Sequence, residues 1–149
     1  MSEPLQIRGR PSRSLAVALL QAAGLPTSDL TDTHLEHFFF AGTDATPAAL
    51  IGLEIYRTDA LLRSLVVTAP LRTQGWGSAL VAHAEDYASA RRVGSIYLLT
   101  TTAELFFERR GYQRVDRTQA PSTILATREF SSLCPASSAF MVKRIQKDS

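Results

Sequence analysis

The chain has 149 residues, enough for one compact domain with a hydrophobic core and too few for two comfortable ones. Apolar residues make up 45% of it and charged residues 20%, and the net charge is +2 with no lysine-rich tail or basic stripe. We therefore expect a single domain over residues 1–149 and no nucleic acid partner. A membrane partner is not expected either, because no apolar run approaches the roughly 20 residues that span a bilayer.

Targeting and metal-binding signals are not found in the sequence. The N-terminal residues lack a long apolar segment behind a basic start, so we expect a cytoplasmic protein without a secretory leader. Cys134 is the only cysteine, which excludes an internal disulfide and a CxxC zinc site. The histidines do not have the spacing of a known ligand pair, so we expect no metal.

The N-terminal half has the pattern of a short strand, a helix and three more strands. Leu5 to Arg10 is the strand candidate, and residues 11–24 have helical periodicity, a serine cap at Ser12 or Ser14 and Gly24 as the stop. The apolar face of this helix is expected to include Leu15, Leu19 and Ala22. Three apolar, β-branched runs then indicate consecutive antiparallel strands: His37–Gly42, Leu50–Arg57 and Leu61–Thr68.

The C-terminal half alternates helices with strands. Residues 75–91 predict an amphipathic helix with an apolar face of Trp76, Leu80, Ala84 and Tyr87. A strand at 95–100 precedes a second helix, with a capping-box signature at Thr101 and Glu104 and a left-handed stop at Gly111. A strand at 112–116, a short helix near Pro121 and a strand at 137–145 follow. The order predicts an α/β (α+β) fold with one mixed, mainly antiparallel sheet of about six to seven strands and helices on both faces.

Two glycines stand where the helix at residues 75–91 begins. Glycine lets the backbone turn sharply and lets a ligand approach main-chain amides, which have no intrahelical partner at a helix start. Such a corner favours anions, above all phosphate, and Arg72 adds positive charge beside Gly75 and Gly77. The alternative is a tight turn that serves packing alone, because Gly-x-Gly is a weak signal. No Walker motif occurs, and Leu80 stands where a dinucleotide motif needs its third glycine.

These residues carry a resemblance to a known family. The segment LVVTAPLRTQGWGSAL, residues 65–80, resembles the acetyl-coenzyme A signature of the GNAT superfamily of N-acetyltransferases, and Arg72, Gly75 and Gly77 match its Gln/Arg-x-x-Gly-x-Gly/Ala pattern. AELFFERRGY, residues 103–112, resembles the superfamily's later helix, AxxFYxxxGF, and the element order agrees from Ile7 to Ile145. LLRSLVV, YLLTTTAELFFERRGY and TREFSSLCPASSAFM are similar to the subfamily found with arsenic-resistance genes.

The resemblance implies one acetyltransferase domain that uses acetyl-coenzyme A as co-substrate. It implies that the backbone amides of residues 72–78 hold the pyrophosphate, that the strand at 65–67 pairs with the pantetheine, and that the Val67 N–H polarises the acetyl carbonyl. The coenzyme-binding residues that it implies are Leu65, Val66, Val67, Arg72, Thr73, Gln74, Gly75, Trp76, Gly77, Ser78, Thr100, Phe106 and Phe107. Relatives often form dimers, so a homodimer is a further hypothesis.

Phe107 departs from the superfamily pattern. A tyrosine often stands at this position and protonates the departing sulfur, whereas a phenyl ring cannot donate a proton. Thr100 likewise replaces the asparagine that often begins this helix, with a hydroxyl that can still donate to pantetheine. The sequence does not choose among the alternative proton donors, which are Tyr97, Tyr112, Ser132, Cys134 and water.

The acceptor side is expected to contain a base and polar groups that bind the substrate. The acceptor amine must be neutral to attack, and Glu54 is the best-placed candidate base, with Glu36 as a weaker one. The alternative is that Glu54 lies on a solvated strand face. Arg63 and Arg128 suit a carboxylate, phosphonate or arsonate of the substrate, or else form surface ion pairs. The other substrate-side candidates are Ser64, Ser132 and Cys134, the last with packing as its alternative role.

The sequence therefore supports two functional hypotheses. The leading hypothesis is transfer of an acetyl group from acetyl-coenzyme A to a primary amine of a small molecule, by direct attack in a ternary complex. Kinship with the arsenic-resistance subfamily adds an amino-acid-like toxicant as the acceptor. The rival hypothesis is a non-catalytic acetyl-coenzyme A-binding sensor or interaction module, which the loss of the tyrosine at Phe107 would permit.

Overall fold

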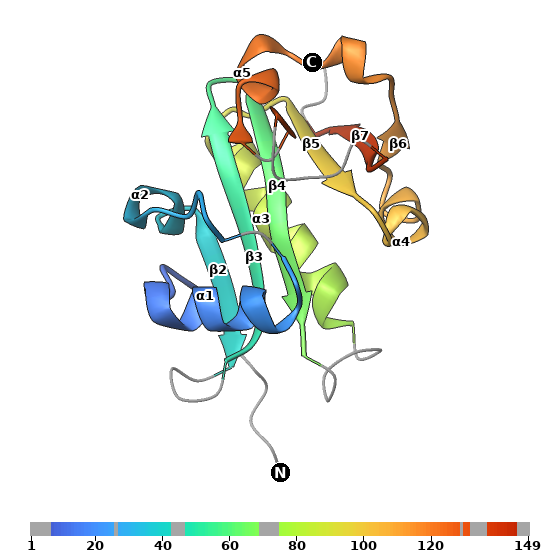
Figure 1. Cartoon of the computed structure of the whole chain (residues 1–149). Helices are drawn as coiled ribbons and strands as arrows, with labels where there is room; N and C mark the ends of the chain where they lie inside the picture. Colours follow the sequence, from blue (N-terminus) through green and yellow to red (C-terminus); the bar gives the residue numbers. More distant parts are fainter. Residues whose placement is uncertain are drawn as a thin grey trace. The chain divides into compact units, whose positions relative to one another are not determined.

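The computed structural model describes residues 7–25, 27–42, 47–68, 75–128, 130–131 and 137–145. Its strands form one sheet in the order β1 (Ile7–Gly9), β2 (Phe38–Gly42), β3 (Pro47–Tyr56), β4 (Asp59–Val67), β5 (Ser95–Thr100), β7 (Ala139–Arg144) and β6 (Gln113–Arg114) (Figure 1). β4 pairs with β5 in parallel, whereas β1 with β2, β2 with β3, β5 with β7 and β6 with β7 are antiparallel. The predicted mixed, mainly antiparallel sheet is thus confirmed, with seven strands.

The described residues pack as two units. One comprises Met1–Leu53 with Ser64–Ala84, and the other Glu54–Arg63 with Glu85–Ser149, so each strand of the β3–β4 hairpin contributes to both. In the first unit, α1 (Arg13–Ala22) packs its buried residues against β2, β3 and β4 through Phe38, Phe40, Leu50 and Val66. The buried face of α1 consists of Ala16, Leu19 and Leu20, which corrects the predicted stripe, because Ala22 is exposed.

The ends of α1 follow from its sequence. The Ser12 hydroxyl accepts a hydrogen bond from the Leu15 N–H at 3.3 Å and caps the N-terminus, as predicted. Gly24 has φ +72°, and the Leu25 N–H reaches the Leu20 carbonyl at 2.9 Å, which closes the helix in a Schellman motif. A left-handed glycine was therefore the right stop signal.

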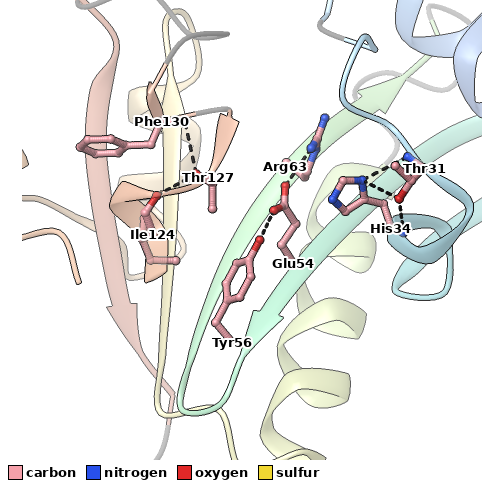
Figure 2. Close-up of polar contacts among 8 residues, drawn as sticks. All are labelled: Thr31, His34, Glu54, Tyr56, Arg63, Ile124, Thr127 and Phe130. Atoms are coloured by element: carbon pink, nitrogen blue, oxygen red, sulfur yellow. Dashed lines mark hydrogen bonds and ion pairs between the residues drawn. The ribbon is translucent and has the colours of Figure 1, made fainter. Parts of the chain in front are cut away.

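A short helix, α2 (Asp32–Leu35), was not predicted. The Thr31 hydroxyl accepts from the His34 N–H at 3.2 Å, and His34 Nδ1 accepts from the Thr31 N–H at 3.1 Å (Figure 2). This is a capping box in which histidine replaces the usual Glu or Gln, so the sequence pattern did not reveal it.

The helices of the C-terminal half form where they were predicted, although the second is shorter than predicted. α3 (Trp76–Ala90) buries Leu80, Val81, Ala84 and Ala88, whereas Trp76 and Tyr87 are only half-buried, so its apolar face is rotated from the predicted one. α4 (Glu104–Glu108) has Ala103 as its N-cap, and the Ala103 N–H donates to the Thr100 hydroxyl at 3.0 Å. The predicted capping box at Thr101 is therefore wrong, because the helix starts too late for Thr101 to cap it.

The second unit is completed by α4, a 3-10 turn η2 (Arg117–Gln119) and α5 (Ser122–Leu125). Gly111 has φ +94° and ends α4 as predicted, with the Tyr112 N–H bonded to the Phe107 carbonyl at 3.1 Å. β5 pairs with β7 along its whole length, from Ser95 with Arg144 to Thr100 with Ala139. Among the described helices, none has the length and apolar character needed to cross a membrane.

Candidate functional site

The C-terminal part of β4 contains a left-handed residue. Ser64 has φ +63°, an uncommon conformation for a residue other than glycine, directly before Leu65, Val66 and Val67. Beyond this point, the Thr68 N–H donates to the Ala48 carbonyl of β3 at 2.8 Å. The segment in which the resemblance implies pairing with pantetheine is thus preceded by a change of backbone direction, and Val67 at its end is half-buried.

The head of α3 has the backbone that the glycine pattern indicated. Gly75 has φ +84°, and its carbonyl accepts the first helical hydrogen bond, from the Ala79 N–H at 3.0 Å. The amides of Trp76, Gly77 and Ser78 therefore precede the first intrahelical bond, at the positive end of the helix dipole. No acidic side chain occupies this first turn. Arg72, Thr73 and Gln74 lie outside the described residues.

Among the described residues, none crowds Gly75. A Cβ atom built on this glycine would meet no heavy atom of the described residues within 4 Å. Its conformation, and not crowding, is therefore the reason that glycine fits here, because other L-residues rarely adopt a φ near +84°. The corner combines a glycine bend with the first-turn amides of α3.

A buried polar cluster connects β3 and β4 in the second unit. Arg63 Nη1 donates to Glu54 Oε2 at 2.8 Å, and the Tyr56 hydroxyl donates to Glu54 Oε1 (Figure 2). The side chain of Arg63 is 0% exposed and that of Glu54 is 5% exposed. The solvated strand face considered for Glu54 is therefore wrong, and so is a surface ion pair for Arg63. Both hairpin strands place these side chains inward, where each charge needs the other.

Tyr56 was not singled out from the sequence. It lies two residues after Glu54 on β3, so the two side chains share one face of the strand. Unlike Glu54 and Arg63, Tyr56 is only half-buried. Two polar residues at i and i+2 in an apolar strand were the signal that could have identified it.

The residue at the superfamily's acid position is part of the core. Phe107 is buried and contacts Phe106 and Tyr112 edge-on, with ring centroids 5.0 and 5.5 Å apart. Phe106 is half-buried, and the Arg110 guanidinium lies 3.6 Å from its ring centroid. The Thr100 hydroxyl accepts the Ala103 N–H described above, so its oxygen helps to start α4.

The two tyrosines considered as alternative acids differ. Tyr112 is 1% exposed and donates its hydroxyl to Glu85 Oε2 at 3.1 Å. Burial, with the Glu85 carboxylate as a second cause, raises the pKa of the Tyr112 hydroxyl far above its usual value, which makes Tyr112 a poor proton donor. Tyr97 is half-buried on β5, where burial and the Asp59 carboxylate raise the pKa of its hydroxyl against the opposing effect of Arg144.

The remaining substrate-side candidates are only partly described. Arg128 is exposed after α5, and Ser64 is half-buried in β4. Ser132 and Cys134 lie outside the described residues, so their roles stay predictions. Glu54 and Arg63, both predicted for the acceptor side, are joined directly by an ion pair.

The fold and these local features agree with a family of known enzymes. The model of the acetyltransferase (GNAT) family matches residues 12–112, from before α1 to Tyr112. The chain belongs to this family. The matched stretch includes the Glu54–Arg63 pair, the bend at Gly75 and the whole of α4. None of the curated proteins matched the sequence.

Solved GNAT structures share the fold at low sequence identity. N-acetylglutamate synthase from Neisseria gonorrhoeae, complexed with coenzyme A and N-acetyl-glutamate, is 19% identical with a TM-score of 0.81, over 99% of this chain and 36% of that one. Ribosomal-protein-S18-alanine N-acetyltransferase from Escherichia coli is 17% identical with a TM-score of 0.72, over 98% and 97%. Rv2747 from Mycobacterium tuberculosis, in complex with CoA and NLQ, is 16% identical with a TM-score of 0.73, over 93% and 98%. The chain thus spans about a third of the length of the synthase.

Proposed function

We propose that this protein transfers an acetyl group from acetyl-coenzyme A to a primary amine of a small molecule. The observation that carries the proposal is the left-handed Gly75 at the head of α3, inside the segment matched by the GNAT family model. Coenzyme A in the N-acetylglutamate synthase and Rv2747 structures supports the choice of co-substrate.

The corner at Gly75 fits the diphosphate of coenzyme A. It places the first-turn amides of α3 at a helix start, and no heavy atom of the described residues lies within 4 Å of a Cβ built on Gly75. The predicted ligands Arg72, Thr73 and Gln74 precede it in the sequence. In this proposal the Val67 N–H donates a hydrogen bond to the acetyl oxygen and stabilises the negative charge that develops there.

Acetyl transfer also requires removal of a proton from the acceptor. The neutral amine nitrogen attacks the carbonyl carbon, the C–N bond forms, the C–S bond breaks and coenzyme A leaves as a thiolate. Tyr56 is a half-buried residue, and its hydroxyl already donates to the Glu54 carboxylate. We assign Glu54 as the base that takes the amine proton through Tyr56, with Arg63 as the residue that positions its carboxylate.

The binding step is tested with Gly75→Val. A β-branched residue is strained at φ +84° and adds bulk to the corner, so we expect the affinity for acetyl-coenzyme A to fall at least about tenfold in isothermal titration. Gly24→Val is the matched control, because Gly24 also has a left-handed φ and no described heavy atom within 4 Å of a built Cβ. Equal losses for both variants would count against the phosphate corner.

The proton-transfer step is tested with Tyr56→Phe. Loss of the hydroxyl is expected to lower kcat about 10- to 100-fold in a thiol-release assay over an amine panel, with little change in acetyl-coenzyme A affinity. Tyr112→Phe removes another tyrosine–glutamate hydrogen bond and is expected to retain activity. If Tyr56→Phe keeps full activity, Tyr56 is not on the proton path.

One observation favours the rival function. Phe107 cannot donate a proton and its ring is buried, so the enzyme's usual acid is missing. A sensor or interaction module would show tight acetyl-coenzyme A binding and no thiol release with any amine. Release of thiol in proportion to an added amine would exclude that reading.

A finer hypothesis concerns the acceptor. Similarity to the arsenic-resistance subfamily supports an amino-acid-like toxicant that bears an oxyanion, and the exposed Arg128 could pair with that group. Arg63 is less suited, because Glu54 already holds it in the interior. The natural protein should prefer acceptor amines that bear a carboxylate over the corresponding carboxamides. Loss of this preference in Arg128→Gln would support the assignment.

A further inference from the structure

We propose that the acceptor amine bears an apolar group, ideally an aromatic ring, which binds against a cluster of half-exposed rings around Phe140. This inference rests on the proposed function and specifies its substrate. The Phe140 cluster has a buried centre of Leu61, Ile124 and Phe140. Half-buried apolar residues pack against it: Tyr56, Tyr97, Leu99, Val115, Ala120 and Phe130.

Aromatic rings dominate the cluster. Tyr97 is stacked on Phe140 with ring centroids 5.5 Å apart and planes at 13°, and Phe130 meets Phe140 edge-on at 5.2 Å. The rings come from β5, β7 and the segment after α5. Stacked and edge-on contacts at these centroid distances are the geometries that aromatic pairs prefer. The cluster therefore presents a defined apolar surface.

Phe130 is fixed by the backbone around it. The buried Thr127 hydroxyl donates to the Ile124 carbonyl at 2.7 Å and accepts from the Phe130 N–H at 3.3 Å (Figure 2). The Ser131 N–H adds a bond to the Thr127 carbonyl at 2.9 Å. A buried threonine thus ties the backbone at Phe130 to α5, whose Ile124 lies in the centre of the cluster.

Tyr56 joins the Phe140 cluster to the candidate base. Its ring packs against the cluster while its hydroxyl donates to Glu54. A proton acceptor and an apolar surface therefore meet at one side chain. An amine that gives its proton to Tyr56 would place the substituent it carries beside these rings.

Two of the cations near the cluster are already engaged. Arg63 is paired with Glu54, and Arg117 Nη2 donates to the Ser138 carbonyl at 3.0 Å while its guanidinium lies 5.3 Å from the Phe130 ring centroid. Neither is poised for a substrate carboxylate. The surface instead offers ring faces, which bind apolar groups and also attract the ammonium form of an arriving amine.

The test compares matched acceptors in a thiol-release assay. 3-Phenylpropylamine and propylamine have similar basicity and differ by the ring, and phenylalanine and alanine repeat the comparison with a carboxylate present. Burial of one aromatic side group corresponds to a ratio of kcat/KM of about 10 to 100 in favour of the ring within each pair. Binding of the same amines to the coenzyme A-loaded protein is measured in parallel by ligand-observed NMR.

Two variants assign the preference to this surface. Phe130→Ala is expected to lower the ring-to-no-ring ratio at least about fivefold, and because both acceptors see the same protein, loss of folded enzyme cancels from the ratio. Leu125→Ala is the control, because Leu125 is exposed on α5 and does not belong to the cluster. Leu125→Ala is expected to keep the ring-to-no-ring ratio within about twofold of that of the natural protein.

The outcomes separate this inference from the proposed function. If the protein turns over amines with a preference for the ring, and Phe130→Ala removes that preference, both the proposed function and this inference are supported. Turnover without a ring preference, or with a preference that Phe130→Ala leaves intact, overturns the inference while the proposed function stands. Ring-dependent amine binding without any turnover supports the aromatic binding surface and overturns the proposed enzymatic function. If neither amine binding nor turnover is observed, both proposals are overturned.

Discussion

Two polar clusters in the second unit have the same three chemical parts in opposite arrangements. In one, Glu54 holds the cation of Arg63 and the hydroxyl of Tyr56. In the other, Glu85 holds Lys143 Nζ, at 3.0 and 3.1 Å, and the hydroxyl of Tyr112 (at 3.1 Å). Around Glu54 the cation is buried and the tyrosine is half-exposed, whereas around Glu85 the tyrosine is buried and the cation is 28% exposed.

This reversal suits the Glu54 cluster to proton transfer and the Glu85 cluster to joining secondary-structure elements. In the Glu54 cluster, the tyrosine hydroxyl donates to the carboxylate while its half-exposed ring packs against the Phe140 cluster, and the cation is buried. The Glu85 cluster turns an ammonium toward solvent and joins α3 to β7 and to Tyr112, which follows α4. In the proposed mechanism, proton transfer therefore belongs to the Glu54 cluster, while the Glu85 cluster holds elements together. Variants of each part should separate the two roles.

The largest effect on stability is expected for Arg63→Met. It removes the cation from a pair whose side chains are 0% and 5% exposed, and so leaves the Glu54 carboxylate buried without its counter-charge. The free energy of unfolding should fall by about 3 to 5 kcal/mol, as measured by urea denaturation.

A double variant provides the control for that experiment. Glu54→Gln with Arg63→Met removes both charges and keeps an oxygen that accepts from Tyr56, so it should be more stable than Arg63→Met alone. A loss below about 1 kcal/mol in Arg63→Met would show that water reaches Glu54 and that the cluster is not sealed.

Tyr112→Phe should have a smaller effect that depends on pH. Burial first, and Glu85 second, raise the pKa of the Tyr112 hydroxyl, so the folded protein keeps a proton that the unfolded chain releases above about pH 10. The stabilising contribution is complete below that pH and is lost as pH rises. Near pH 7 the variant should lose about 1 to 2 kcal/mol, because one hydrogen bond to a carboxylate is missing.

Alkaline denaturation measures the difference in slope. Between about pH 10 and pH 12, the stability of the natural protein should fall more steeply than that of Tyr112→Phe, by up to about 1.4 kcal/mol per pH unit. Parallel curves would mean that the hydroxyl ionises in the folded state as readily as in the unfolded chain.

Most of the fold was predictable because its signals are local. Gly24 and Gly111 end helices at left-handed positions, and the strand at 95–100 has the predicted bounds. The errors concern features decided by three-dimensional context. α2 depends on a histidine in a capping box, and the buried face of α3 depends on which side meets the sheet, which periodicity locates only to within a residue or two.

The site was less predictable because it depends on pairing across the hairpin. Glu54 and Arg63 were proposed from the sequence for separate roles, on the acceptor side, and the structure bonds them to each other. Nine residues separate them along the chain, and only the register of β3 with β4 brings them together. Tyr56 was missed because a tyrosine in a strand usually signals packing. The left-handed Gly75, by contrast, follows from a glycine before a helix.

The smallest effect is expected for Lys143→Met, the counterpart of Arg63→Met. The Lys143 and Glu85 side chains are 28% and 17% exposed, so water can solvate the remaining carboxylate, which also keeps the Tyr112 hydrogen bond. We expect a loss of about 1 kcal/mol in urea denaturation, most of which 1 M salt should abolish by weakening the natural pair. A loss as large as that of Arg63→Met would contradict the distinction between the two clusters. The partly exposed ion pair would then contribute as much as the buried one, and burial would not explain their roles.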